Sequence, residues 1–148
     1  MSIQLYENQG DSTPYSSGTF TNAFLHNFDG RIGGIHEVKI FVRNDDSLHV
    51  YEDISMSIEQ FDTLEIDFVG GDDGFSFKLF AGDTQPTSDE WSTINYAIPG
   101  SPGEIDLSDL TDTNTWLPVW IRIEIPASIP VQRLKTVRFK VSATESDV

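Results

Sequence analysis

The stretch that decides the fold is VWIRIEI, residues 119–125, in which apolar and polar side chains alternate without a break. Its valine and three isoleucines fall on one side of an extended chain, whereas Trp120, Arg122 and Glu124 fall on the other. This period of two predicts a β-strand in a sheet with one buried and one hydrated face. Pro118 precedes the alternation and is expected to mark its start, at a bulge or edge where a ladder N–H is dispensable. Trp120 is expected to point outward.

The same period recurs along the chain and indicates an all-β fold. Turn signals such as NDDS (44–47) and GGDDG (70–74) separate the alternating segments at intervals of about ten residues, a spacing typical of an antiparallel sandwich or barrel. The predicted strands are HEVKIFVRN (36–44), LHVYEDISMSIE (48–59), TLEIDFV (63–69), FSFKLF (75–80) and VRFKVSA (137–143), with a weaker one at 19–28. We therefore expect an antiparallel immunoglobulin-like β-sandwich of about seven or eight strands.

Two regions depart from this pattern. Residues 1–18 are rich in Gly, Ser, Pro and Asn, which predicts an extended N-terminal arm outside the core, followed by a single domain over 19–148. The long segment 81–115 contains several prolines and glycines, and we expect within it a strand at 94–98. A short helical turn is also expected around TSDEW (87–91), capped by Thr87 or Ser88.

Composition excludes several function classes. The 148 residues carry 24 acidic against 9 basic side chains, and a net charge of −15 repels nucleic-acid phosphates. The absence of cysteine excludes disulfides, thiolate metal sites and cysteine nucleophiles. The sequence begins without a basic and apolar leader, and its apolar runs are far shorter than the roughly 20 residues of a membrane helix. We expect neither nucleic acid nor membrane as a partner.

No catalytic constellation emerges from the motifs. His26, His36 and His49 lie in no nucleophile signature, and GRIGG (30–34) lacks the lysine and the strand-to-helix setting of a phosphate loop. Calcium is the better hypothesis for the acidic residues, with Asp72 and Asp73 in one loop and three aspartates in another as candidate ligands: Asp106, Asp109 and Asp112. Their spacing is not that of an EF-hand, so turn formation is the favoured interpretation. The sequence thus predicts no catalytic residue, no metal and no cofactor.

Aromatic residues provide the remaining signal. Trp91, Tyr96, Trp116 and Trp120 gather in the second half of the chain, mostly where the strand pattern breaks or faces outward. Exposed indoles can stack on sugar rings, or they can anchor a protein–protein interface. For Trp91 and Trp116, closing the ends of the sandwich is an equally good interpretation. Trp120 belongs on the outer face by its phase, which favours a covered patch there.

Several segments together show a resemblance to a known class of proteins. KIFVRNDDSLHVYEDISMSI, PTSDEW, TWLPVWIRIEIPASIPVQ and the closing VRFKVSATE resemble small β-sandwich virion proteins of tailed bacteriophages, across about residues 37–145. That class includes head decoration, head-fibre, tail and baseplate components. The segment 81–115 has no counterpart in it.

The resemblance implies a non-enzymatic structural protein of the phage particle, made in the host cytoplasm and present in multiple copies or as a homo-oligomer. It would stabilise the particle through contacts with major capsid or tail proteins and with copies of itself, and the N-terminal arm would bind a neighbour. The competing hypothesis is a carbohydrate-binding or adhesive module, perhaps calcium-assisted, with Trp91, Tyr96 and Trp120 on the sugar. The predicted interface residues are Ile3, Leu5, Tyr6, Phe41, Trp91, Tyr96, Trp116 and Trp120.

Overall fold

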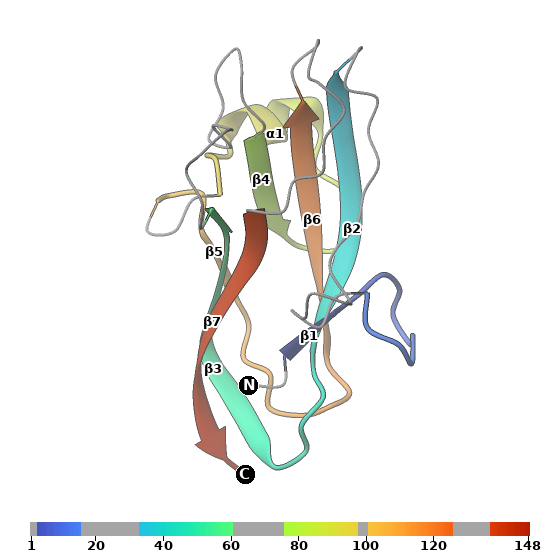
Figure 1. Cartoon of the computed structure of the whole chain (residues 1–148), viewed down its shortest axis with the longest axis vertical. Coiled ribbons are helices and arrows are strands. Elements are labelled where there is room, and N and C mark those ends of the chain that lie inside the picture. Colours follow the sequence, from blue (N-terminus) through green and yellow to red (C-terminus); the bar gives the residue numbers. More distant parts are fainter. Residues whose placement is uncertain (1–2, 16–32, 61–75, 98–100, 126–136) are drawn as a thin grey trace.

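The computed structural model describes residues 3–15, 33–60, 76–97, 101–125 and 137–148. Within these ranges the chain folds into two antiparallel sheets that face each other (Figure 1). Sheet A has the order β1 (Ile3–Tyr6), β2 (Gly34–Asn44), β6 (Trp116–Ile125) and β4 (Ser76–Ala81). Sheet B has the order β5 (Ile105–Leu107), β3 (His49–Gln60) and β7 (Val137–Asp147). The predicted all-β class is confirmed, whereas the segments at 19–28, 63–69 and 70–74 lie outside the described residues.

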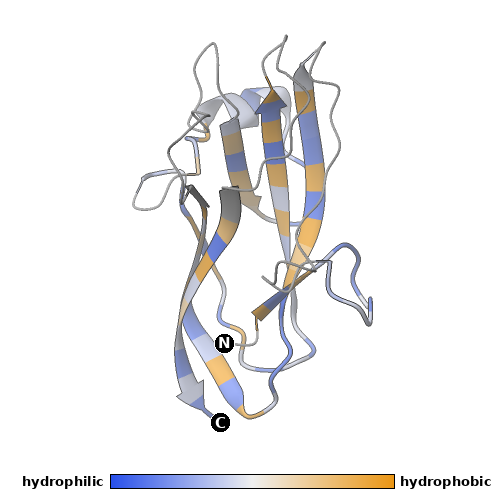
Figure 2. Cartoon of the chain, in the orientation of Figure 1, coloured by the Kyte–Doolittle hydropathy of each residue, from blue (hydrophilic) through white to orange (hydrophobic). Residues whose placement is uncertain are grey.

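The core forms where the alternating apolar residues of the two sheets meet. In β6, the odd positions Val119, Ile121 and Ile123 are at most 2% exposed, as VWIRIEI predicts. Their counterparts in sheet B are Ile54, Met56 and Ile58 of β3, which belong to the same hydrophobic cluster. Figure 2 shows the resulting alternation of apolar and polar bands along β2 and β6. Full burial of each large aliphatic side chain contributes about 1.5–3 kcal/mol, so this shared layer holds the sheets together.

A short connection at residues 45–48 carries the chain from β2 in sheet A to β3 in sheet B. Asn44, fully buried, organises it: its Nδ2 donates to His49 O at 2.9 Å, and its Oδ1 accepts from Asp46 N at 2.7 Å. The Asp46 carboxylate lies 2.7 Å from His49 Nδ1, and this hydrogen bond raises the pKa of the imidazole. β2 and β3 are consecutive strands in different sheets, and so are β6 and β7, which pair with β2 and β3 respectively.

The N-terminal residues are not an irregular arm throughout. Ile3–Tyr6 forms β1, which pairs with the last residues of β2 from Ile3↔Asn44 to Tyr6↔Phe41. Leu5 and Tyr6 are 7% and 2% exposed, so the expectation that this segment lies outside the core is wrong for them. Tyr15 N donates to Leu5 O at 2.7 Å and covers the outer edge of β1. The alternation Ile3, Leu5 is too short to stand out in the sequence, but β2 offers it a complementary edge.

Pro118 lies inside β6 rather than before it, because the strand begins at Trp116. It faces Phe41 of β2, and its carbonyl accepts from Gly82 N at 3.1 Å on the β4 side. Its nitrogen points to that same side, where β4 has already ended at Ala81. A proline is therefore tolerated in this central strand because the N–H it lacks would face the end of the neighbouring strand.

The segment between β4 and β6 contains the predicted helical turn but not the predicted strand. Helix α1 (Ser88–Thr93) begins with a capping box in which Thr87 Oγ1 accepts from Glu90 N and Glu90 Oε2 accepts from Thr87 N. Residues 94–97 are not a strand, and Ile98 lies outside the described residues. Ala97 instead bridges the sheets: its N–H donates to Phe77 O of β4 and its carbonyl accepts from Ile58 N of β3. This double role prevents a regular ladder with either strand.

A β-bulge in β3 shifts the phase of the strand. The register with β7 changes between Glu52 and Ser55, and Asp53 adopts φ of 51°, in the left-handed region. The shift places Tyr51 in the core together with Ile54, although the two are three residues apart. Without the bulge, Tyr51 would face solvent.

Because the backbone at Asp53 is left-handed, we expect substitutions there to differ in their effect on the free energy of unfolding. Asp53→Val should lower the free energy of unfolding by about 1–2 kcal/mol, because a β-branched side chain disfavours this conformation. Asp53→Gly removes the same carboxylate but accepts the backbone angle, and should unfold close to the wild-type chain in urea. Equal destabilisation by both variants would show that the carboxylate, not the backbone angle, matters.

Candidate interface on the outer face of sheet A

The outer face of sheet A gathers aromatic and cationic side chains from strands far apart in sequence. The register pairs Arg43 with Trp116 and Lys39 with Trp120 between β2 and β6, and it pairs Phe80 with Trp120 between β4 and β6. Facing residues of antiparallel strands share one face of the sheet, so these side chains form neighbours. We call this surface the aromatic–cationic face; it comprises Lys39, Arg43, Lys78 and Arg122 together with Tyr6, Phe41, Phe80, Trp91, Tyr96, Trp116 and Trp120.

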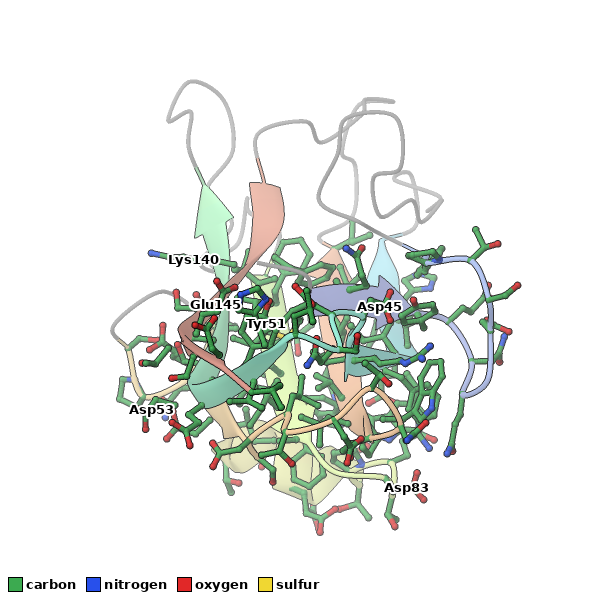
Figure 3. All side chains as sticks on the ribbon, turned by 90° about the horizontal axis from the view of Figure 1, so that it is seen from below. Asp45, Tyr51, Asp53, Asp83, Lys140 and Glu145 are labelled. Carbon is green, nitrogen blue, oxygen red and sulfur yellow. The ribbon has the colours of Figure 1, made fainter. Side chains whose placement is uncertain are left out.

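Each of its four cations lies over an aromatic ring. The distances from the charged group to the ring centroid range from 4.6 Å for Arg43 over Trp116 to 5.9 Å for Arg122 over Trp91. Contacts within about 6 Å are attractive, because the ring quadrupole presents its negative face to the cation. Lys140, by contrast, is exposed on β7 in sheet B (Figure 3). In the described part of this acidic chain, four cations are therefore gathered on the outer face of sheet A.

Arg43 is held by several contacts at once. Its Nε donates to Thr113 O at 2.7 Å, and its guanidinium stacks on Trp116 while also facing Tyr6 at 5.8 Å. The Tyr6 and Trp116 rings meet edge to face at 5.0 Å, and Phe41 contacts the Trp116 ring at 6.4 Å. Asp45 completes the group, because its carboxylate accepts a hydrogen bond from the Tyr6 hydroxyl and its Oδ1 lies 3.5 Å from Arg43 Nε. These contacts fix the rings before any partner arrives.

Lys39 occupies the middle of the face. Its Nζ lies 5.2 Å from the Phe41 centroid and 5.8 Å from that of Trp120, and it pairs with the exposed Asp83 carboxylate at 2.6 Å. The Trp120 indole Nε1 donates to Asp83 O at 3.1 Å. The loop at Asp83 is therefore the partner of Trp120 within the chain, which the sequence did not identify. The predicted outward orientation of Trp120 is confirmed, since it shares a face with Lys39 and opposes Val119.

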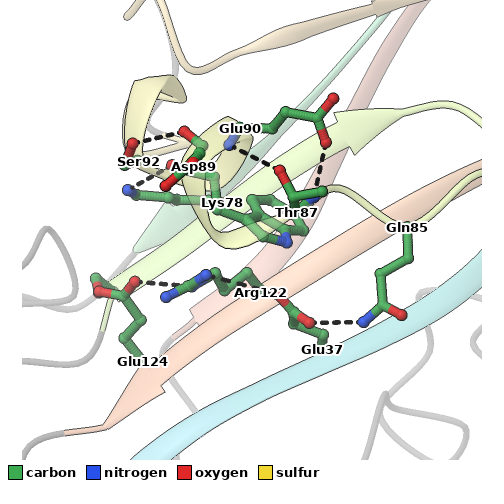
Figure 4. A network of polar contacts seen from close by, with 11 residues as sticks. Glu37, Lys78, Gln85, Thr87, Asp89, Glu90, Ser92, Arg122 and Glu124 are labelled. Carbon is green, nitrogen blue, oxygen red and sulfur yellow. Dashed lines mark hydrogen bonds and ion pairs between the residues drawn. The ribbon is translucent and has the colours of Figure 1, made fainter.

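Helix α1 covers the remaining end of the face (Figure 4). Trp91, 0% exposed, packs from α1 against Phe80 and Arg122. Lys78 Nζ donates to Trp91 O at 3.0 Å, whereas Arg122 pairs with Glu124 at 2.9 Å and with Glu37 at 3.5 Å. The aromatic–cationic face thus has a covered end beneath α1 and an open end.

The open end consists of Phe41, Trp116, Pro118 and Trp120, all of which are half-buried. Of the predicted interface residues, Phe41, Trp116 and Trp120 therefore meet here, with Tyr6 buried beside Trp116.

The other predicted interface residues lie elsewhere. Trp91 is enclosed and Tyr96 is half-buried beside Lys78. Ile3 and Leu5 lie on the opposite face of β1, where Leu5 belongs to the core and Ile3 packs against it. Sequence reasoning did not include Lys39, Arg43, Phe80 and Arg122 among the interface residues. Their outward positions in the alternation of β2, β4 and β6 could have placed them on this face.

Of the acidic candidates in the described part of the chain, Asp112 serves a turn. Asp112 Oδ1 accepts from Asn114 N at 2.7 Å and from Thr115 N at 2.8 Å, and these bonds, the first above all, lower its carboxyl pKa. Asp109 accepts weakly from Asp53 N at 3.3 Å, while Asp106 is exposed on β5. No group of three or more metal-ligating side chains is found in the described ranges, which omit Asp72 and Asp73. His36 and His49 are half-buried on strands, and His26 lies outside these ranges.

Comparisons with protein-family models, with curated proteins and with solved structures give no match. No helix within the described residues has the length and apolar character needed to cross a membrane.

The Tyr6–Asp45 contact provides a test of this arrangement by titration. Burial, followed by the hydrogen bond and charge of Asp45, raises the pKa of Tyr6 from 10.0 to about 12. A raised pKa means that the folded state holds the phenol proton more tightly, so this stabilisation is complete below about pH 10 and is lost as the pH approaches 12. Asp45→Asn should lower the Tyr6 pKa, leaving the burial contribution, as followed by NMR of the tyrosine ring carbons.

Tyr15 is an internal control for this measurement. Its pKa is also raised, but by burial and by the charge of Glu7, so Asp45→Asn should leave its titration in place. An unchanged Tyr6 titration in the variant would contradict the proposed contact.

Proposed function

We propose that this chain is a non-enzymatic structural protein of a tailed-phage particle, which binds a neighbouring subunit through the open end of the aromatic–cationic face. The observation that carries the proposal is the half-exposed group Phe41, Trp116 and Trp120, held in place by Lys39 and Arg43. Trp, Tyr and Arg are the residues that most often dominate binding energy at protein interfaces. The resemblance of residues 37–145 to small virion proteins supplies the kind of assembly, and an immunoglobulin-like arrangement of the sheets is part of the proposal.

Rigidity favours this use of the face. Binding normally costs entropy for each flexible side chain that becomes fixed at an interface. Here Arg43 is already held by Thr113 O and Trp116, and Trp120 by Asp83 O and Lys39. A partner would therefore gain the burial of the exposed ring surface at a lower ordering cost, as a decoration subunit adding to a particle requires.

Two features make sugar stacking the weaker hypothesis. Trp91, one of the three residues assigned to the sugar, is 0% exposed and presents no ring face to a ligand. Trp120 has Lys39 over its ring, and Trp116 has Arg43 over its own, so one face of each indole is already occupied. A pyranose ring would have to displace these cations or use the other face.

Removing one of the half-buried rings should strongly reduce incorporation while leaving the fold intact. In the source phage, Trp116→Ala or Phe41→Ala should reduce the amount of this protein in purified particles at least about tenfold, as expected when an interface anchor is lost. Leu48→Ala, which truncates a side chain that is 70% exposed at the β2–β3 connection, is the control and should incorporate normally.

Two accompanying measurements separate assembly from folding and from sugar binding. Thermal unfolding of each purified variant shows whether the domain persists, since a misfolded variant would be lost from particles for another reason. Normal incorporation of folded Trp116→Ala would overturn the proposed interface. Binding to a glycan array that is lost in Trp120→Ala would favour the carbohydrate hypothesis instead.

A further inference from the structure

The edge of β4 that faces away from β6 has little bonding in the described residues. Gly82 N donates to Pro118 O, which places the even-numbered backbone groups of this segment on the β6 side. Alternation then puts the N–H and C=O groups of Phe77, Leu79 and Ala81 at the other edge. Phe77 O accepts there from Ala97 N at 2.9 Å, the one loop contact that the described ranges provide. The backbone groups of Leu79 and Ala81 continue this edge to the end of β4.

A groove of about 360 Å³ follows the same edge. One wall is β4, and the other is the segment leading into β5, the edge strand of sheet B (Figure 1). Its lining combines apolar side chains, among them Leu79, Ile94, Pro102 and Ile105, with three polar ones, Thr93, Asn95 and Asp106. A groove with an open strand edge on one wall is suited to an extended peptide, whose backbone pairs with the edge while its side chains fill the groove.

Charge selects the partner. Asp106 is exposed at the groove and takes part in none of the ion pairs of the described residues. Asp89 and Glu90 lie in the first turn of the nearby helix α1, and the whole chain carries a charge of −15. Lys78 does not offset them, because it already bonds Trp91 O and faces Tyr96. The field favours a basic segment and disfavours a second copy of this acidic chain.

We propose that this edge of β4, unpaired at Leu79 and Ala81 within the described residues, binds one extended, basic segment of a different protein by strand addition. The segment pairs its backbone with Leu79 and Ala81, places small apolar side chains against Ile105 and Pro102, and directs a lysine or arginine to Asp106. This site lies on the edge of sheet A and does not depend on the interface proposed for its outer face.

The test uses the full chain and two fluorescent nine-residue peptides, one alternating valine with lysine and one alternating valine with glutamate. Fluorescence anisotropy should show the lysine peptide binding at least about tenfold more tightly than the glutamate peptide, as a charge-assisted contact predicts. Asp106→Asn should weaken the lysine peptide several-fold. Glu7→Gln, which removes one negative charge at an exposed position of the N-terminal segment, should leave the affinity unchanged.

Isotope-filtered NMR locates the bound peptide. Contacts from the peptide backbone to the amides of Leu79 and Ala81 are expected, because strand addition pairs these groups directly. The proposal is overturned if the lysine peptide does not bind, if Asp106→Asn and Glu7→Gln weaken it equally, or if the contacts fall elsewhere. Self-association of the chain that uses the same two amides would replace the basic partner with a second copy, and would also overturn it.

Discussion

The antiparallel register of β6 with its two neighbours is the constraint on which the rest of the structure depends. On its inner side, β6 contributes Val119, Ile121 and Ile123 to the layer shared with sheet B. On its outer side, the same register places Trp116 opposite Arg43 and Trp120 opposite Lys39. A slip of one residue would exchange the two faces, burying Arg122 and exposing the isoleucines. One set of backbone hydrogen bonds therefore fixes both the core and the candidate interface.

The distribution of charge gives this face its character. A chain with a net charge of −15 could hold its few cations on the surface as counter-charges. Instead, Lys39, Arg43 and Arg122 lie over aromatic rings and also pair with carboxylates at Asp83, Asp45 and Glu37. Exposed ion pairs alone contribute little stability, but here each cation also orients a large ring. The rings of this face are therefore held in fixed positions, and its cations are largely neutralised by the paired carboxylates. Such a surface is better suited to bind a partner of complementary shape than to attract an oppositely charged one.

The two surfaces proposed for binding use different physics. At the open end of the aromatic–cationic face, fixed rings offer apolar area to a complementary surface. At the edge of β4 that the described residues leave unpaired, the backbone of Leu79 and Ala81 offers directional hydrogen bonds and Asp106 offers charge. Helix α1 lies between them, because Trp91 covers Phe80 and Arg122 on the outer face while Thr93 lines the groove. A change in α1 would thus affect both surfaces.

The sequence by itself determined the all-β class, the inward residues of β6, the outward phase of Trp120 and the helical turn of α1. These features follow from local periodicity and from hydrogen bonds between near neighbours, and both can be inferred from adjacent residues. Only the tertiary structure decided that residues 3–6 join sheet A, that Pro118 lies inside a strand, that Ala97 bridges the sheets, and that Lys39 and Arg43 meet Trp120 and Trp116. Each of these depends on which strand lies beside which, and on where it ends. Pairing between strands tens of residues apart leaves no periodic trace in either strand, so it appears only when the chain has folded.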